Sequence, residues 1–501
     1  MKNLLKTTGI MMLGAAVLFT GCKKDKDEKF SVTATTNNPE WGVVVGGGEF
    51  DEGTEIVLAA TANEGYHFVK WSNELTDNPL KLVVTKNESL IAYFAEGNGG
   101  NPGGGGTSDP QSITLSGTID ANTTWKDLGL PVDYIVDGTI YLEGNALVTV
   151  EPGVTIMFTG TNGGIYVGEN AGLKMAGTAE KPIVFTGPTN NQNVGAWDYI
   201  SITSNRSENI WENVTFKNGG SNSDGAVVWI ENEAKVSMKN CIIDGSLANG
   251  IIVKGNSVFA AFEGNTITNC AKNPISIDSW KSVLTLNANN IFANNGNNTI
   301  AITDGAWSFE NNDKNTLKKM PVPYYLKETL RLAGSQTFTI EAGTVIKMAS
   351  GIGLAIEEDV TFIAEGTTTE PIEISGFENE KSYWGTVDYH SQKSNSSIKY
   401  VNFKDGGKER DYGMFYIAYE ETRLTMENCS FSNTESAGIV ITYAGSIGKV
   451  NINNDTYSNC DGGNVKVSGE YGKEDENGEW QDLISEGQTF DNFAAVKAAM
   501  E

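Results

Sequence analysis

Short apolar runs with a period of two recur along most of the chain, and turn-forming residues separate them. Ile275 and Ile277 flank one polar residue, and Ile300 and Ile302 repeat this arrangement farther along the chain. A period of two is typical of strands with one buried face. Glycine, asparagine, serine and threonine lie between the runs, as turns require. The pattern therefore predicts an all-β protein built from many short strands.

A long repeat divides the strand-rich part of the chain into two copies. The segment LEGNALVTVEPGVTI at 142–156 matches LAGSQTFTIEAGTVI at 332–346. Farther along, VTFKNGG in the first copy matches VNFKDGG in the second at nearly the same offset. We therefore expect two similar modules, module one at residues 111–315 and module two at residues 316–470.

A shorter period lies inside each copy. Asn213, Asn240, Asn265 and Asn290 open similar segments at nearly even spacing. A turn of about 25 residues cannot bury its own apolar face, but it can do so when stacked on identical turns at about 4.8 Å. The spacing predicts a right-handed parallel β-helix, with these asparagines stacked at one bend. A β-sandwich, the competing fold, would not produce this period.

These turns and bends resemble the β-helix proteins of the pectate-lyase-like superfamily, and most closely the β-helix lipoproteins of Bacteroidota, over residues 115–470. The resemblance implies a parallel β-helix that acts on polysaccharides or binds them. The motifs of polygalacturonase-like members are Asn-Thr-Asp, Asp-Asp, Gly-His-Gly and Arg-x-Lys, and none occurs in this sequence. We therefore assign no catalytic residue.

Residues 30–96 form a separate module in which alternating strands are joined by glycine clusters. Its features include the GGG turn, Tyr66, Phe68, Trp71 and a closing strand that ends in AYF. This stretch resembles the divergent internalin-type B-repeat. The resemblance implies a small β-rich module for spacing or adhesion, with the three aromatic side chains in its core.

Two polar segments flank the β-helix. The Gly-rich linker at 97–110 is expected to separate the first module mechanically from the β-helix. The acidic tail at 471–501 is expected to be a loop ending in a short helix that caps the stack.

The N-terminus has the layout of an export signal. Residues 1–21 contain Lys2 and Lys6, then an apolar run of about ten residues that is too short to span a bilayer. Cys22 follows two small residues, and this arrangement resembles the bacterial lipoprotein signal, which implies lipid attachment at Cys22. The charged tether at 22–29 contains KKDKDE and resembles the surface-export signal of Bacteroidota lipoproteins. We therefore expect a lipid-anchored outer-membrane protein that faces the cell exterior.

The charge balance narrows the choice of partners. The formal net charge is −27, and the chain has only four arginines. Such a surface repels phosphates, so nucleic acid is not an expected partner. The expected partners are the membrane, through the lipid anchor, and a polysaccharide or another surface protein.

Four cysteines recur in pairs between the two copies. Cys241 and Cys429 are equivalent, as are Cys270 and Cys460, and each follows an asparagine. No histidine is near enough in sequence to suggest a zinc site. We favour buried free thiols, and disulfides remain the alternative.

One outer face of module one gathers residues that suit sugar binding. If Ile275 and Ile277 point inward, Lys254 lies one turn below Asp278. Thr303 lies one turn above it, and Asp304 is the next residue along the chain. Tryptophans fall near the ends of the same strands. This proposed strip comprises Trp229, Lys254, Asp278, Trp280, Asp304 and Trp307.

The strip allows three interpretations. It is a glycan-binding surface, a lyase site with Lys254 as base and Asp278 and Asp304 as calcium ligands, or an ordinary polar face. No motif indicates calcium or any other cofactor. The sequence therefore favours a surface lipoprotein whose rigid β-helix binds glycans or another surface partner. A polysaccharide lyase or glycoside hydrolase, and a structural adhesin-like stalk, are the alternatives.

Overall fold

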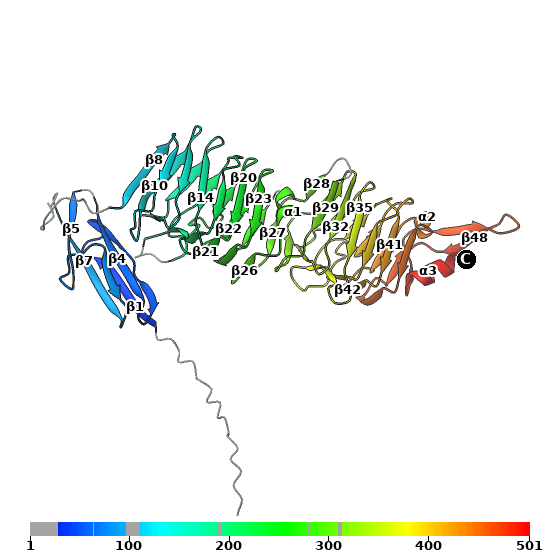
Figure 1. Cartoon of the computed structure of the whole chain (residues 1–501). Coiled ribbons are helices and arrows are strands. Elements are labelled where there is room, and N and C mark those ends of the chain that lie inside the picture. Colours follow the sequence, from blue (N-terminus) through cyan, green and yellow to red (C-terminus); the bar gives the residue numbers. More distant parts are fainter. Residues whose placement is uncertain (1–28, 64, 97–110, 189–192, 279, 309–312) are drawn as a thin grey trace, which may run out of the picture.

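A computed structural model describes residues 29–63, 65–96, 111–188, 193–278, 280–308 and 313–501. These residues form a small β module followed by a long stack of turns (Figure 1). The proposed signal, Cys22, all of the tether except Lys29, and the linker lie outside the described residues.

The N-terminal module consists of two small sheets packed around one core. Trp71 and Leu58 are fully buried in this core, whereas Tyr66 stacks on Trp41 at its edge with ring centroids 5.3 Å apart. The strands are β1 (Lys29–Thr36), β2 (Gly42–Val45), β3 (Gly48–Asp51), β4 (Glu55–Ala62), β5 (Tyr66–Trp71), β6 (Leu80–Val83) and β7 (Glu88–Glu96).

The rest of the described chain is a parallel β-helix of about 14 turns, which confirms the all-β prediction. Each strand pairs in parallel with strands of the turns below and above it. The first turn contributes β8 (Ile113–Ile119) and β9 (Thr123–Trp125), and the long strand β10 (Tyr134–Leu142) bends across two sheets.

Four sheets form the walls of the coil, and we number them 1 to 4. Sheet 1 contains the first half of β10, β12 (Thr155–Phe158), β15 (Ile183–Thr186), β18 (Val214–Gly219), β21 (Ile242–Ser246), β24 (Thr266–Cys270) and β26 (Ile291–Ala293). Sheet 2 begins with the second half of β10, β13 (Gly164–Val167), β16 (Ile200–Ile202), β19 (Ala226–Ile230), β22 (Asn249–Val253), β25 (Ile275–Ile277) and β27 (Ile300–Ile302). It continues through β30 (Tyr324–Leu326), β33 (Val345–Met348), β36 (Ile372–Gly376), β39 (Val401–Lys404), β42 (Ser430–Thr434) and β45 (Thr456–Cys460).

Sheets 3 and 4 complete the coil. Sheet 3 comprises β9, β11 (Leu147–Val150), β14 (Gly172–Ala176), β17 (Ile210–Glu212), β20 (Lys235–Lys239) and β23 (Val258–Glu263), then β29 (Asp313–Leu317), β32 (Gln336–Ile340), β35 (Thr361–Glu365), β38 (Ser397–Lys399), β41 (Leu424–Glu427) and β44 (Val450–Asn453). Helix α1 (Trp280–Thr285) contacts both β23 and β29 and joins these two halves. Sheet 4 comprises β28 (Ala306–Ser308), β31 (Leu330–Ala333), β34 (Leu354–Ile356), β37 (Val387–Tyr389), β40 (Phe415–Ile417), β43 (Ile439–Ile441), β46 (Val465–Val467) and β49 (Gln488–Phe490).

The two copies of the repeat are rotated by one sheet relative to each other. The strand β27 pairs with β25 of module one on one side and with β30 on the other. In the sequence repeat, β30 of module two corresponds to the first half of β10, which lies in sheet 1 of module one. In the structure, however, β30 extends sheet 2. Likewise, the strands of sheet 4 in module two correspond to the strands of sheet 2 in module one. The rotation follows the turn in which α1 replaces a strand.

Aromatic side chains stack inside the coil from turn to turn. Phe185 and Phe216 lie with ring centroids 5.2 Å apart, and Phe403 and Phe431 repeat the arrangement in module two at 5.0 Å. Successive turns repeat at about 4.8 Å, so flat rings at one strand position stack naturally. This packing fills the interior along the whole axis.

Trp197 and Trp384 hold equivalent places in the two copies and are fully buried. Trp197 Nε1 donates a hydrogen bond to the Lys217 carbonyl at 2.7 Å, and Trp384 Nε1 donates to the Lys404 carbonyl at 2.6 Å. Gly219 lies against the first indole, where a Cβ would come within 2.7 Å of the ring. The repeated Trp and Gly-Gly motifs are therefore one packing unit.

Asn265 and Asn290 form a buried amide ladder at the bend after sheet 3. The Asn265 backbone N–H donates to Asn290 Oδ1 at 3.0 Å, and the Cys241 N–H donates to Asn265 Oδ1 at 2.9 Å. Asn265 Nδ2 also donates to the Met238 carbonyl at 3.1 Å. These bonds satisfy backbone groups that the sharp bend leaves outside the strand ladder.

The prediction that Asn213 and Asn240 belong to the same stack is wrong. They lie one position earlier, with φ of 49° and 51°, in the left-handed region that asparagine tolerates. Gly264, with φ of 69°, holds that place on the next turn. Asparagine is the left-handed residue on some turns and the ladder residue on others, so spacing alone did not separate the two roles.

The four described cysteines are free thiols. Cys241 holds a ladder position, whereas Cys270 pairs with Ser246 of the turn below, so the two thiols are in different columns. Burial raises the pKa of Cys241 and of Cys270 to about 12. These thiols therefore stay protonated and act as small packing groups, in agreement with the favoured sequence interpretation.

The N-terminal module packs against the side of the β-helix, which corrects the expectation of mechanical separation. Val45 of β2 is buried in a cluster with Ile135 and Met157, and Val43 and Ala59 pack at its margin. Ile135 and Met157 point outward from the first turns of the β-helix. Two outward apolar residues at this place were not recognised from the sequence as a contact.

The C-terminal end of the coil is covered by α3 (Phe493–Met500) and by β49, which pairs antiparallel with β46. Phe493 and Val496 of α3 are buried against the core. The strands β47 (Tyr471–Glu474) and β48 (Trp480–Ile484) form a hairpin, not the expected loop, and it projects from this end (Figure 1). Within the described part of the chain, no helix is long and apolar enough to cross a membrane.

Replacing Gly219 with alanine tests the packing unit of Trp197. The new Cβ would lie 2.7 Å from the buried, hydrogen-bonded indole, so ring and strand must move apart. We expect the free energy of unfolding to fall by about 1–3 kcal/mol, measured by chemical denaturation. Gly160→Ala is the control, because a Cβ there meets nothing within 4 Å. Equal stability of the two variants would contradict this role.

Asp455 occupies a ladder position in module two and gives a pH-dependent prediction. Its Oδ1 accepts from the Cys429 N–H at 2.8 Å, and its Oδ2 is buried with no hydrogen-bond partner. Burial raises the pKa of Asp455 from 3.8 to about 7. The unfolded chain therefore loses this proton first, and stability falls as pH rises from about 4 to about 7.

Asp455→Asn removes this penalty and supplies an amide that fits the ladder, as Asn265 does one module earlier. We expect the variant to gain about 2–4 kcal/mol at pH 8 and little at pH 4, measured as thermal unfolding across pH. Asp411→Asn, at an exposed position, should show no such pH-dependent gain. A gain that is the same at both pH values would refute the role of ionisation.

Candidate functional site

The outer face of sheet 2 in module one holds Trp229, Lys254 and Asp278, and Asp304 follows the end of β27 close to Asp278. The Lys254 N–H donates to the Ile230 carbonyl of the turn below, and the Asp278 N–H donates to the Val253 carbonyl, so Lys254 and Asp278 directly follow β22 and β25. Lys254 thus lies one turn below Asp278, as the alternation indicates. Trp229 lies in β19 and pairs with Ile252 of β22.

Lys254 and Trp229 form a cation–π contact across successive turns. The Lys254 Nζ lies 4.8 Å from the centroid of the Trp229 ring. A contact of this kind holds the ring of the half-buried tryptophan in a set orientation on the sheet. The pair therefore presents an oriented aromatic surface beside a cation.

Lys254 and Asp304 both lie close enough to Asp278 to act electrostatically on its carboxyl group. Burial raises the pKa of Asp278, the carboxylate of Asp304 raises it further, and Lys254 opposes the rise. Asp278 Oδ1 also accepts from the Gly255 N–H at 2.9 Å. The arrangement offers carboxylate acceptors and an ammonium donor to hydroxyl groups of a ligand.

Trp280 and Trp307 do not belong to this surface, which corrects the proposed strip. Trp307 is 1% exposed and packs inside the coil with its ring centroid 5.8 Å from that of Phe338. It faces inward because β28 starts a new sheet, in which Trp307 pairs with the buried Leu332. Trp280 begins α1 and packs against the core, because a helix replaces the expected strand.

Three tyrosines that the sequence interpretation missed extend the same face downward. Tyr141 pairs with Tyr166, which pairs with Ser201, which pairs with Trp229, so these residues share one outward column. The rings of Tyr141 and Tyr166 are 6.1 Å apart, and Tyr141 is 42% exposed. We call Tyr141, Tyr166 and Trp229 the aromatic row. It spans three turn spacings, about 14 Å.

Tyr199, the third of these tyrosines, lies beside the aromatic row. Burial raises the pKa of Tyr199, and the nearby Asp198, Tyr141 and Tyr166 raise it further. The available signal was the spacing between Tyr141 and Tyr166 in the sequence, which equals the turn period. To use this spacing, the first turns must be aligned with one another, and no asparagine marks the bend in these turns.

No three His, Cys, Asp or Glu side chains within the described ranges are grouped so that they could hold a metal ion. Asp278 and Asp304 are a pair only. The aromatic row and its neighbours therefore offer ring faces and hydrogen-bonding groups, not a built metal centre.

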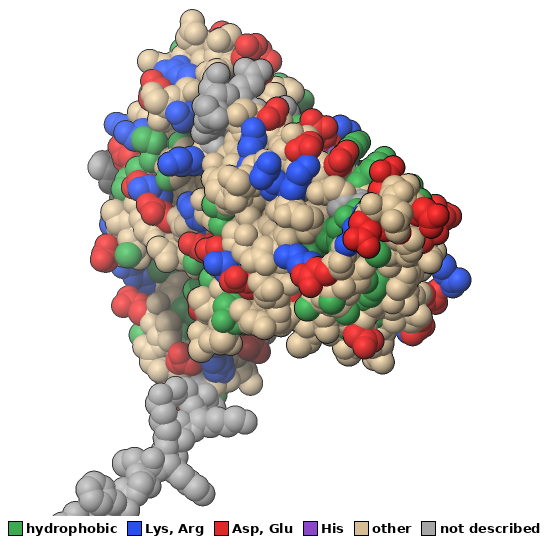
Figure 2. Space-filling model, turned by 90° about the vertical axis from the view of Figure 1, so that its right-hand side faces the viewer, with side chains coloured by type: hydrophobic (Ala, Val, Ile, Leu, Met, Phe, Trp, Pro, Cys, Tyr) green, Lys and Arg blue, Asp and Glu red, His purple; other side chains and the backbone are tan. Residues whose placement is uncertain are grey.

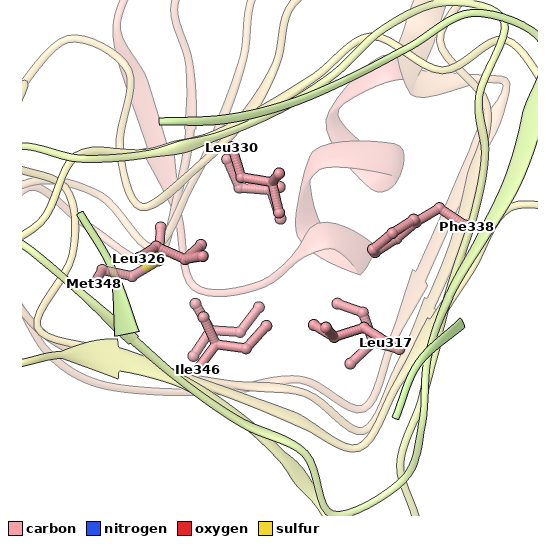
Figure 3. Close-up of a pocket in the computed structure, with 9 residues that line it drawn as sticks. Leu317, Leu326, Leu330, Phe338, Ile346 and Met348 are labelled. Atoms are coloured by element: carbon pink, nitrogen blue, oxygen red, sulfur yellow. The ribbon is translucent and has the colours of Figure 1, made fainter. Parts of the chain in front are cut away.

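One small cavity lies inside the coil, near the start of module two. It measures about 10 Å³ and is lined by apolar side chains that point toward the axis, among them Leu317, Leu330 and Phe338 (Figure 3). An apolar space of about one water volume stays dry. It is a packing gap and provides no ligand site.

Charged groups are mixed on the end of the molecule that carries α3. Figure 2 shows acidic and basic side chains next to one another there, with acidic groups gathered on one flank. Many of the described charges are paired, for example Lys381 with Asp461 at 2.6 Å and Arg410 with Glu435 at 2.6 Å. The described residues of this end therefore form no broad basic surface.

Comparison with known proteins assigns domain types to two parts of the chain. Residues 32–98 match the divergent InlB B-repeat domain, and residues 117–227 match the pectate-lyase-like β-helix domain. The chain joins these two domain types. No curated protein and no solved structure matches it. The β-helix match includes Tyr141 and Tyr166, whereas Trp229 lies just beyond its end.

Proposed function

We propose that this protein is a cell-surface glycan-binding lipoprotein whose β-helix is a rigid scaffold for the aromatic row. The observation that carries this proposal is the column of Tyr141, Tyr166 and Trp229, with Lys254 stacked on the last ring. Sugar rings expose apolar C–H faces that stack on aromatic rings. Their hydroxyl groups bond to carboxylates, hydroxyls and ammonium groups.

The scaffold supports this function because backbone ladders hold the rings at a set spacing. Little conformational entropy is lost on binding when the contacts are preorganised. Asp278 and Lys254 lie at the upper end of the row, where they can bond hydroxyl groups of a sugar stacked on Trp229. A polysaccharide chain therefore finds ring faces and polar groups in one line.

The cellular location rests on the N-terminal sequence. Cys22 after two small residues and an apolar run supports lipid attachment, and the charged tether supports display on the exterior of the outer membrane. The N-terminal module then lies between the anchor and the β-helix. An InlB-type repeat is suited to spacing or adhesion at this position.

The lyase alternative draws support from the proximity of Lys254, Asp278 and Asp304. In that role Lys254 would remove a proton from a uronic acid unit while the carboxylates hold calcium. Incubating the protein with a uronic acid polymer and calcium, and following the absorbance of unsaturated sugar ends, distinguishes a lyase from a binding protein. Product formation that is lost in Lys254→Ala would favour the lyase.

Trp229→Ala tests the aromatic row. We expect affinity for the polysaccharide selected from an array of neutral and uronic acid polymers to fall at least about tenfold, because a stacked ring and the site of Lys254 are lost together. Isothermal titration measures the change, and Lys254→Ala should give a smaller loss. Trp480→Ala, which removes a 63% exposed ring from the C-terminal hairpin, is the matched control. Unchanged affinity in both Trp229 and Lys254 variants would exclude this surface.

Cys22→Ser tests the anchor. Without the thiol no acyl chains are attached, and each buried CH₂ group that is lost removes about 0.8 kcal/mol of membrane affinity. We expect the variant to move from the detergent phase to the aqueous phase in detergent phase separation of cell extracts. A chain that still partitions with detergent would show another mode of membrane attachment.

A further inference from the structure

The outer face of sheet 4, in module two, carries a second group of aromatic residues. Tyr416 of β40 lies at its centre and pairs with Asp388 of β37 on one side and Val440 of β43 on the other. Three tyrosines around it are 42%, 44% and 49% exposed, and these are Tyr412, Tyr419 and Tyr443. We call these four tyrosines the tyrosine cluster.

A hydrogen-bonded network forms the floor of the tyrosine cluster. Ser468 Oγ donates to Thr442 Oγ1 at 3.3 Å, and Thr442 Oγ1 donates to the Tyr416 hydroxyl at 2.7 Å. Nearby, His390 Nε2 lies 2.6 Å from Asp388 Oδ1. These groups come from four successive turns, so they line up along the axis of the coil.

Two of the three exposed rings, those of Tyr412 and Tyr419, pack edge-on against this floor and are thereby oriented. The Tyr412 ring is 4.9 Å from the Tyr416 ring at an interplanar angle of 75°, and the Tyr419 ring is 4.5 Å from the His390 ring at 84°. Edge-to-face contacts of this kind stabilise ring positions. The cluster thus combines ordered ring faces with hydroxyl and imidazole groups, as the aromatic row combines rings with Lys254 and Asp278.

The repeat places the two sites at equivalent positions in the two modules. Tyr416 follows Trp229, and Thr442 follows Lys254, at nearly the offset that separates the two copies of the repeat. In each module the residue that follows the next strand contacts the central ring, Lys254 by a cation–π contact and Thr442 by a hydrogen bond. The side chains differ, but the cross-turn pairing is the same.

The two sites do not form one continuous surface. Trp229 is on sheet 2 and Tyr416 is on sheet 4, because the second copy of the repeat is rotated by one sheet. They are separated by seven turns, roughly 34 Å along the axis. One sugar chain of a few units therefore cannot contact both.

We propose that the tyrosine cluster is a second, independent binding site for an uncharged polysaccharide, so that one protein holds two glycan strands. The proposal rests on the proposed function, because both sites use ring faces to bind sugars. An uncharged chain fits because Asp388 lies next to the central Tyr416 and the protein carries a net charge of −27. Both features repel anionic sugars.

The experiment is a titration of the full chain in detergent with neutral hexasaccharides (cellohexaose, xylohexaose and mannohexaose), with hexagalacturonate as the anionic comparison. We expect two equivalents of a neutral hexasaccharide per chain. Tyr416→Ala should remove one equivalent and leave the one that depends on Trp229. Tyr93→Ala, which removes a 37% exposed ring from the N-terminal module, is the control and should retain both.

A second variant keeps the test informative if Tyr416→Ala fails to fold. The double variant Tyr412→Ala with Tyr419→Ala removes only exposed rings, and we expect it to weaken the second binding event about tenfold. Two unchanged equivalents in this variant and in a folded Tyr416→Ala would overturn the second site and leave the proposed function intact. If these variants lose one equivalent and Trp229→Ala loses none, the result would support the second site and contradict binding at the aromatic row.

The remaining outcomes also decide the matter. If no neutral hexasaccharide binds the native protein, the second site is overturned, and binding of hexagalacturonate at Trp229 alone would preserve the proposed function. If hexagalacturonate binds the tyrosine cluster more tightly than the neutral sugars do, the assigned ligand class is wrong. If nothing in the panel binds, both proposals fail.

Discussion

The backbone hydrogen bonds between successive turns are the constraint on which the rest of this structure depends. A turn of the β-helix has no core of its own, and its apolar residues are buried only when another turn lies above and below. Parallel pairing holds the turns about 4.8 Å apart, and the side chain at a given strand position points the same way on every turn. Side chains consequently form columns, inside the coil and outside it.

Inside the coil, several columns contain groups that stack on their own kind from turn to turn. Phe185 on Phe216 and Phe403 on Phe431 do so with their ring faces. Asn290 and Asn265 do so with amide hydrogen bonds at the bend. A side chain that cannot stack interrupts the column, as the unpartnered oxygen of Asp455 illustrates. The interior therefore favours apolar groups and amides that fit against the turns above and below.

Outside the coil, the same geometry brings distant residues into line without restricting their identity. Tyr141, Tyr166 and Trp229 are far apart in sequence but lie on one face because they share a strand position. Charged residues also line up on sheet 3, where Lys399 lies between Glu365 and Glu427 of the neighbouring turns and pairs with both. An outward face of this scaffold therefore presents columns whose side chains recur at the interval of the turns.

The sequence by itself determined the fold class, the parallel β-helix, the doubling of the module and the inward or outward direction of Lys254 and Asp278. These follow from the period of two within strands and from the short and long repeat periods, which reflect the strand pleat and the stacking of identical units. Only the tertiary structure decided which outward residues meet. Trp307 faces the core because β28 opens a new sheet, and Tyr141 joins Trp229 through the register of two intervening turns. The rotation at α1 places equivalent residues of the two modules on different faces. These placements depend on how the turns are aligned and where a sheet ends. A local pattern of polar and apolar residues determines neither.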